Sequence, residues 1–122
     1  MARIAIIEDS LTDTAVFTDM LRRNGHHVIT AGSAEEGVEM VRRELPELVL
    51  MDVILPGMNG FQATRALSRD PATSSIPVII VSTKAMETDR VWGLRQGAKD
   101  YMVKPPNEGE LIDRINSLLE AT

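Results

Sequence analysis

Five short strand-like segments, separated by stretches of helical periodicity, constrain this chain more than any other feature of its sequence. Four are continuous apolar runs, at residues 4–7 (IAII), 48–51 (LVLM), 78–81 (VIIV) and 101–103 (YMV). A fifth and weaker candidate lies at 27–31 (HVITA). Runs that do not alternate apolar with polar residues are typical of parallel strands that helices cover on both faces.

Helical patterns with start signals lie between these segments. Residues 10–13 (SLTD), 33–36 (SAEE) and 107–110 (NEGE) each have the residue types and spacing of a capping box. Gly25 is placed to end the first helix. Because strand and helix alternate throughout, the sequence predicts an α/β fold, a doubly wound five-stranded parallel sheet with helices on both faces. No linker or repeat interrupts the pattern, so we expect residues 1–122 to form a single domain without a separate output domain.

The composition excludes several classes of function. The 122 residues include no cysteine, so disulfides and thiolate metal sites are impossible. The net charge of −5 and the absence of a basic stripe argue against nucleic-acid binding. The apolar runs are too short to span a bilayer and no secretory signal precedes them, so we expect no membrane insertion and a cytoplasmic location.

Polar residues lie at the carboxyl ends of four predicted strands. Glu8 and Asp9 follow the first strand, Asp52 the third, Ser82 the fourth and Lys104 the fifth. In a parallel sheet these ends share one edge, where ligands bind. Three carboxylates at that edge would repel one another unless a cation lies among them, and Mg²⁺ suits two carboxylates plus waters. Alone, Asp52 could simply form the turn that follows it, but the joint pattern favours a site.

These motifs resemble the response-regulator receiver domain, the CheY-like module of two-component signalling. The resemblance covers essentially the whole chain, including the MDVILPGMNG segment at 51–60, the QGAKDYMVKP segment at 96–105 and the closing helix. It implies the flavodoxin-like strand order 2-1-3-4-5. It also implies a phosphorelay protein that accepts a phosphoryl group from a histidine kinase and catalyses only its own phosphorylation and dephosphorylation.

The resemblance assigns roles to the residues at the strand ends. Asp52 would be the phosphoacceptor, and Mg²⁺ would be bound directly by Asp9 and Asp52, by the backbone carbonyl of Ile54, and by Glu8 mostly through water. Ser82 would donate a hydrogen bond to the phosphoryl group and Lys104 would form an ion pair with it. A cis peptide bond is implied before Pro105.

A partner surface is implied as well. In the family, the Ser82 hydroxyl turns inward after phosphorylation, which lets an aromatic residue of the fifth strand, here Tyr101, swing inward. The changed surface comprises the fourth helix, fifth strand and fifth helix, and would bind an output protein. Trp92 is expected to be partly exposed beside Val91 and Leu94, which look like a core face; a partner contact and local packing are equal alternatives for it. We expect a monomer.

Two further segments, 60–70 (GFQATRALSRD) and 73–101, resemble the stand-alone regulators of the chemosensory system of twitching motility, which acts on type IV pili. A phosphate sink that drains a shared kinase without an output target is the alternative. Two rivals are disfavoured: a haloacid-dehalogenase-type phosphatase needs a second acid where Ile54 stands, and a phosphorylation-independent adaptor would not need the full set of polar residues.

Two smaller expectations complete the sequence analysis. Ile54 and Lys84 lie two residues beyond Asp52 and Ser82, where a side chain could hold or block the hydrolytic water. Neither is an amide or an acid that positions water, so we expect slow dephosphorylation. His26 and His27 are expected to be solvated loop or strand residues rather than a metal or phosphorelay site.

Overall fold

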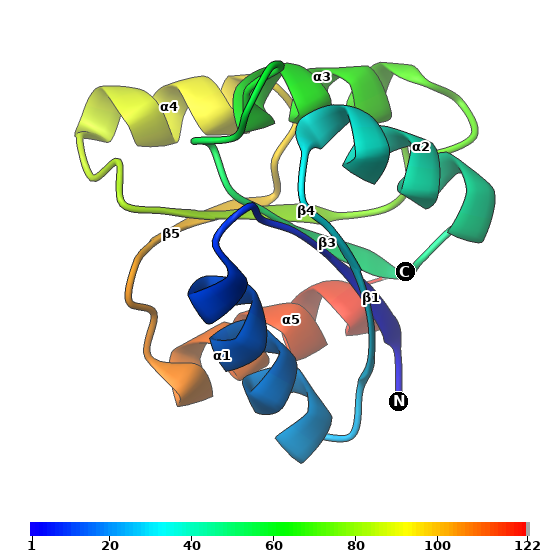
Figure 1. Cartoon of the computed structure of the whole chain (residues 1–122), viewed down its shortest axis with the longest axis vertical. Helices are drawn as coiled ribbons and strands as arrows, with labels where there is room; N and C mark the ends of the chain where they lie inside the picture. The colour runs from blue at the N-terminus through cyan, green and yellow to red at the C-terminus, as the bar shows by residue number, and fades with distance from the viewer. Residues whose placement is uncertain (122) are drawn as a thin grey trace.

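The computed structural model describes residues 1–121 and contains the predicted parallel sheet (Figure 1). Its five strands run in the order β2-β1-β3-β4-β5, so the expected topology is confirmed. The strands are β1 Arg3–Ile7, β2 His27–Ala31, β3 Leu48–Met51, β4 Val78–Ser82 and β5 Asp100–Val103. Each of the five predicted segments corresponds to one strand, with ends that differ by at most one residue. The neighbours of β1 are therefore β2 and β3, as a site at the ends of β1 and β3 requires.

Five helices cover the two faces of the sheet. They are α1 Leu11–Arg23, α2 Ala34–Glu44, α3 Gly60–Arg69, α4 Glu87–Arg95 and α5 Glu108–Glu120. Figure 1 shows α2, α3 and α4 on one face and α1 and α5 on the other. Alternate residues of β1 enter different cores: Ala5 and Ile7 pack under α2, whereas Ile4 and Ile6 pack against α1 and α5. Burial on both faces explains why the strand segments are apolar without alternation.

The starts of α1, α2 and α5 were predicted at the right residues. The sequence predicts a complete capping box with two hydrogen bonds at each start, but only one of the two forms. Ser10, Ser33 and Asn107 each accept a hydrogen bond from the backbone N–H three residues on. The return bond of a capping box is not formed at any of the three in the part of the chain described. At two of the three starts the acidic side chain binds another group, because Asp13 accepts from Lys104 and Glu110 accepts from Arg114. A complete capping box joins Asn59 and Gln62 at the start of α3.

Two packing expectations were wrong. His26 is 7% exposed rather than solvated, and its Nδ1 accepts a hydrogen bond from the Ala2 N–H at 3.2 Å. On α4, Val91 is 38% exposed and the buried residue is Gly93. A Cβ atom at Gly93 would lie 2.9 Å from Ile80 Cδ1 and 3.1 Å from the Tyr101 ring, so α4 approaches the sheet through its smallest residue. Trp92 is 48% exposed, as expected.

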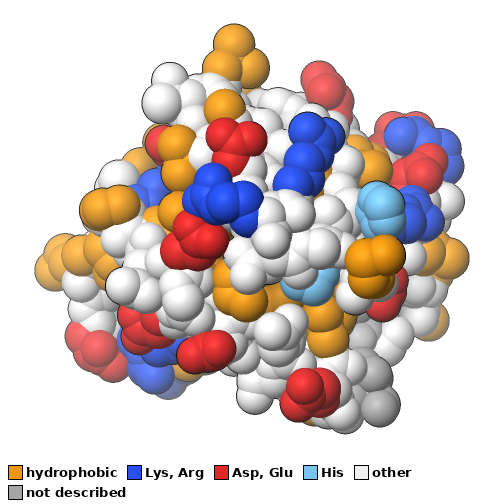
Figure 2. All heavy atoms as spheres, turned by 90° about the horizontal axis from the view of Figure 1, so that it is seen from below, with side chains coloured by type: hydrophobic (Ala, Val, Ile, Leu, Met, Phe, Trp, Pro, Cys, Tyr) orange, Lys and Arg blue, Asp and Glu red, His pale blue; other side chains and the backbone are white. Residues whose placement is uncertain are grey.

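The surface carries mixed charge on the face formed by α1 and α5. Figure 2 shows that face from below, with acidic and basic side chains interspersed among apolar ones and no stripe of one sign. Among the described residues, no helix has the length and apolar character needed to cross a membrane.

Candidate functional site

The backbone at the carboxyl edge of the sheet holds the predicted site residues in adjacent positions. The hydrogen bonds between strands continue one step past the strand ends. The Asp52 N–H donates to the Ile7 carbonyl at 3.0 Å, and the Lys104 N–H donates to the Ser82 carbonyl at 2.9 Å. Each functional side chain therefore leaves the sheet from a fixed backbone position. The peptide bond before Pro105 is cis, as the family resemblance implied.

Asp52 is a buried carboxylate with two differently used oxygens. Its side chain is 7% exposed. One oxygen, Oδ1, accepts the N–H of Val53 at 2.7 Å. The other, Oδ2, accepts from Lys104 Nζ at 3.2 Å. A buried carboxylate is tolerated only where hydrogen bonds and opposite charge replace its lost hydration, and both are present here.

The loop between β3 and α3 folds back against the backbone of Asp52. The Gly60 N–H donates to the Val53 carbonyl at 2.9 Å, and a Cβ atom at Gly60 would lie 1.8 Å from the Asp52 carbonyl oxygen. No larger residue fits there without moving the start of α3 away from Asp52. The loop thus depends on glycine at this close approach.

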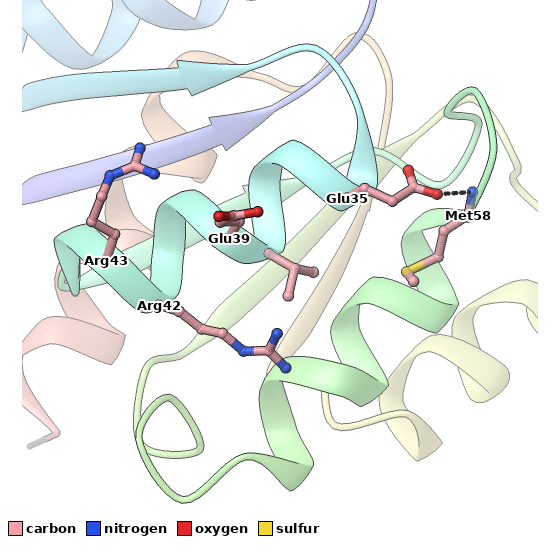
Figure 3. Close-up of a pocket in the computed structure, with 6 residues that line it drawn as sticks. Glu35, Glu39, Arg42, Arg43 and Met58 are labelled. Carbon is pink, nitrogen blue, oxygen red and sulfur yellow. Dashed lines mark hydrogen bonds between the residues drawn. The ribbon is translucent and has the colours of Figure 1, made fainter.

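Glu35, from the first turn of α2, holds the same loop from outside. Its Oε2 accepts the Met58 N–H at 3.1 Å, as Figure 3 shows. Gly57, one residue before, has a φ of +71° and so lies in the region that favours glycine. A groove of about 670 Å³ lies beside this contact. It is formed by α2 and Met58, and it is lined by Glu35, Val38, Glu39, Arg42, Arg43 and Met58.

Lys104 is the positive centre of the site. Its Nζ donates to Glu8 Oε1 at 2.6 Å, to Asp13 Oδ2 at 2.7 Å and to Asp52 Oδ2 at 3.2 Å. The side chain is 11% exposed. Burial opposes its charge, but the hydrogen bonds to Asp13 and Glu8 and the charge of Asp52 outweigh burial and raise the pKa of Lys104 above its ordinary value. The ammonium is therefore charged at any physiological pH.

Glu8 is the carboxylate that burial affects most. Loss of hydration raises the pKa of Glu8 to about 7, although hydrogen bonds from Lys104 and from the Ser10 N–H act in the opposite direction. The charge of the neighbouring Asp52 adds to the rise. Such a group binds a proton readily near neutral pH unless a cation replaces it.

The carboxylates fit a hard divalent cation. Glu8, Asp9 and Asp52 each offer an oxygen, and these oxygens all lie within 4.8 Å of one another. Glu8 and Asp52 are buried, whereas Asp9 is exposed and leaves one side open to water. Oxygen donors of this kind, with open positions for water, match the preference of Mg²⁺. The sequence correctly predicted that these three carboxylates lie close together.

The other predicted residues lie around this centre. Ser82 is fully buried, and its Oγ accepts the Lys84 N–H at 3.3 Å. The Lys84 carbonyl accepts the Tyr101 hydroxyl at 2.7 Å, and Tyr101 is buried. The Lys84 ammonium lies 3.7 Å from Asp89 Oδ1 at the start of α4. Ile54 is exposed.

Asp13 is the site residue that sequence reasoning missed. It was interpreted only as part of a helix cap. The available signal was that Asp13 lies in the first turn of α1, the helix that begins shortly after the Glu8-Asp9 pair. That signal was ambiguous, because an acidic residue in the first turn of a helix is favoured in any case.

Comparison with known proteins identifies the family of this site. The model of the response regulator receiver domain matches residues 4–116. The chain belongs to the response-regulator receiver family. Its similarity to one regulator covers nearly the full length of both proteins: it is 54% identical to protein PilH of Pseudomonas aeruginosa over 98% of each chain. The expected resemblance to a CheY-like receiver of the twitching-motility type is thereby confirmed.

Solved receiver structures have the same fold. A response regulator from Chloroflexus aurantiacus superposes with a TM-score of 0.93 at 28% identity, covering 98% of both chains. The receiver domain of the sensor histidine kinase PA1611 from Pseudomonas aeruginosa superposes with a TM-score of 0.90 at 28% identity, again over 98% of both chains. That structure carries a magnesium ion coordinated in its active-site cleft. The chain is a receiver-domain response regulator.

Proposed function

We propose that this receiver accepts a phosphoryl group from a histidine kinase on Asp52 and then changes a surface that binds a partner. The observation that carries the proposal is the buried Asp52 carboxylate, paired with Lys104 beside two further acids. We propose that this receiver acts as a monomer in the cytoplasm.

The transfer needs one nucleophile and a site that stabilises charge. A carboxylate oxygen of Asp52 attacks phosphorus, the bond from phosphorus to the histidine nitrogen breaks, and the imidazole nitrogen keeps the electron pair. Lys104 donates hydrogen bonds to the phosphoryl oxygens, and Ser82 offers a buried hydroxyl. Hydrolysis by water later returns the carboxylate and inorganic phosphate. The protein thus modifies and restores itself and is not an enzyme acting on other substrates.

Mg²⁺ is the cofactor that we propose for this transfer. Glu8, Asp9, Asp52 and the carbonyl of Ile54 would hold the ion, which would neutralise charge on the phosphoryl oxygens. The geometry of the three carboxylates supports the assignment. The magnesium ion in the PA1611 receiver shows that a related receiver binds this metal.

Phosphorylation at Asp52 can be tested with a small phosphodonor. Incubation with acetyl phosphate and Mg²⁺ is expected to add one phosphoryl group, measured by intact-protein mass spectrometry. Asp52→Asn removes the nucleophile and should abolish the addition, whereas Asp19→Asn, an exposed change on α1, should not. Full labelling of Asp52→Asn would show that another residue is the acceptor.

We propose twitching motility as the pathway, supported by the identity to PilH. An output partner would bind through α4, β5 and α5. Exposed Met86, Trp92 and Val103 on these elements and the loop before α4 favour an output partner, since a phosphate sink needs no apolar contact surface. The sink remains the alternative function. Capture of a partner only when an acyl-phosphate mimic is bound would separate the two.

A further inference from the structure

Asp13 contacts the lysine of the site from an element that carries none of the other site residues. Its Oδ2 lies 2.7 Å from Lys104 Nζ, which is shorter than the 3.2 Å from Nζ to Asp52 Oδ2. The Asp13 N–H donates to Ser10 Oγ at 3.2 Å, so the backbone of Asp13 is fixed by the cap of α1. The carboxylate is therefore presented to Lys104 by a rigid first helical turn.

The three donors of the ammonium are divided among three carboxylates. A lysine ammonium has three N–H groups, and here Glu8, Asp13 and Asp52 each accept one. Glu8 and Asp52 also belong to the carboxylate cluster that fits a metal, whereas Asp13 does not. When a cation and a phosphoryl group engage Glu8 and Asp52, Asp13 is the acceptor that stays available to Lys104.

We propose that Asp13 is a positioning residue that holds the Lys104 ammonium at the mouth of the site during phosphoryl transfer. One N–H stays bound to Asp13 while the others turn to the phosphoryl oxygens. A lysine has a long, flexible side chain, and a fixed anchor keeps its charge where the transferring group passes. This inference rests on the proposed function, since it assigns Lys104 to the phosphoryl group.

The contact between Asp13 and Lys104 can be tested without phosphorylation by measuring how reactive Lys104 is. The chain has only three lysines, Lys84, Lys99 and Lys104, so labelling of each one can be assigned. An amine-reactive acetylating reagent is applied with and without Mg²⁺, and labelling of each lysine is measured by peptide mass spectrometry. Asp13→Asn is expected to raise labelling of Lys104 severalfold relative to Lys99 in both conditions. The matched control is Asp19→Asn, which removes the same charge from an exposed position of α1. A ratio like that of the control in either condition overturns the proposal.

A double-mutant cycle tests whether Asp13 acts through Lys104. With acetyl phosphate and Mg²⁺, Asp13→Asn is expected to slow phosphorylation roughly tenfold, an effect of lost positioning. In a Lys104→Met background the same change should have no further effect. Equal slowing in both backgrounds would mean that Asp13 acts by another route. The helix cap is kept, because it uses the backbone N–H of residue 13.

The lysine-labelling experiment and the phosphorylation experiment together separate this inference from the proposed function. If wild type accepts no phosphoryl group, the proposed function fails, and the labelling ratio still reports on the contact between Asp13 and Lys104. If wild type is phosphorylated and the labelling ratio does not change, only the role of Asp13 fails.

Discussion

At the scale of single residues, burial of the Glu8 carboxyl lowers the stability of the folded protein at high pH. In an unfolded chain its carboxyl has a pKa near 4.5, whereas burial raises the pKa of Glu8 to about 7 in the fold. Between these values the folded state binds more protons than the unfolded state. The contribution of Glu8 to the free energy of unfolding is therefore greatest below pH 4.5, and it is lost as the pH rises through 7.

We expect Glu8→Gln to stabilise the metal-free protein at high pH. Glutamine resembles the neutral acid and removes the cost of ionising a buried group. The gain should be about 1 to 3 kcal/mol at pH 8 and should shrink toward zero near pH 4.5. Urea unfolding with a chelator at both pH values measures it. Glu36→Gln, an exposed change, is the control. A gain of equal size at both pH values would contradict the raised pKa.

The individual residues also show what sequence could and could not predict. Glu8, Asp52 and Lys104 were predictable because the ends of parallel strands share an edge, whichever way the helices pack. Asp13 and His26 were not. Asp13 meets Lys104 only through the way α1 packs beside the end of β5, and the buried His26 lies beside Ala2, which precedes β1. Both depend on packing geometry that no local pattern records.

At the scale of elements, two loops frame the mouth of the site. The β3–α3 loop carries Ile54, and Glu35 holds it through the Met58 N–H. The β4–α4 loop carries Lys84, whose ammonium is directed to Asp89 rather than left free. Neither Ile54 nor Lys84 therefore offers an amide or an acid that could orient water toward a phosphoryl group on Asp52.

We expect this arrangement to give a long phosphorylation lifetime, which changes in the loops should shorten. Ile54→Asn combined with Lys84→Glu supplies an amide and an acid that can hold a water in line. Decay of the phosphorylated protein, followed by mass spectrometry after removal of acetyl phosphate, should become faster by roughly tenfold. The conservative pair Ile54→Leu with Lys84→Arg should decay like wild type. If the first pair also decays like wild type, these positions do not control the lifetime.

The elements themselves were predictable to different degrees. Four strands followed from continuous apolar runs, because strands buried on both faces carry few polar residues. The partly exposed β2 gave only a weaker signal. The starts of α1, α2 and α5 followed from their N-cap residues. The face that α4 turns to the sheet did not follow, since Gly93 packs where a larger apolar residue was expected. An exposed Val91 and a buried glycine reverse the usual pattern of an amphipathic helix.

At the scale of the whole molecule, one chain of contacts joins the site to the proposed partner surface. The Lys84 N–H donates to Ser82 in the site, and the Lys84 carbonyl accepts from Tyr101 on β5. The Tyr101 ring in turn lies against Gly93 of α4, next to exposed Trp92. A hydroxyl that turns toward a phosphoryl group would pull on Lys84 and, through Tyr101, on α4. The charge added at Asp52 would thus shift the position of α4 on the sheet.

Trp92 is the only tryptophan of the chain and can report this coupling. We expect acetyl phosphate with Mg²⁺ to change its fluorescence emission in wild type. Tyr101→Phe keeps the ring but removes the hydrogen bond to the Lys84 carbonyl. In this variant the stoichiometry of phosphorylation should be unchanged, while the change in emission should fall to less than half, because the loop is no longer tied to β5.

Two controls decide between this route and its alternatives. Asp52→Asn should give no change in emission with acetyl phosphate, so a response there would show that the signal does not come from phosphorylation. Asp89→Asn removes the ion pair of the Lys84 ammonium but leaves its backbone bonds to Ser82 and Tyr101, and should respond like wild type. If Tyr101→Phe also responds like wild type, the signal reaches α4 without the Tyr101 hydroxyl. The packing of Gly93 against Ile80 of β4 and against the retained ring at position 101 would then be candidates to carry it.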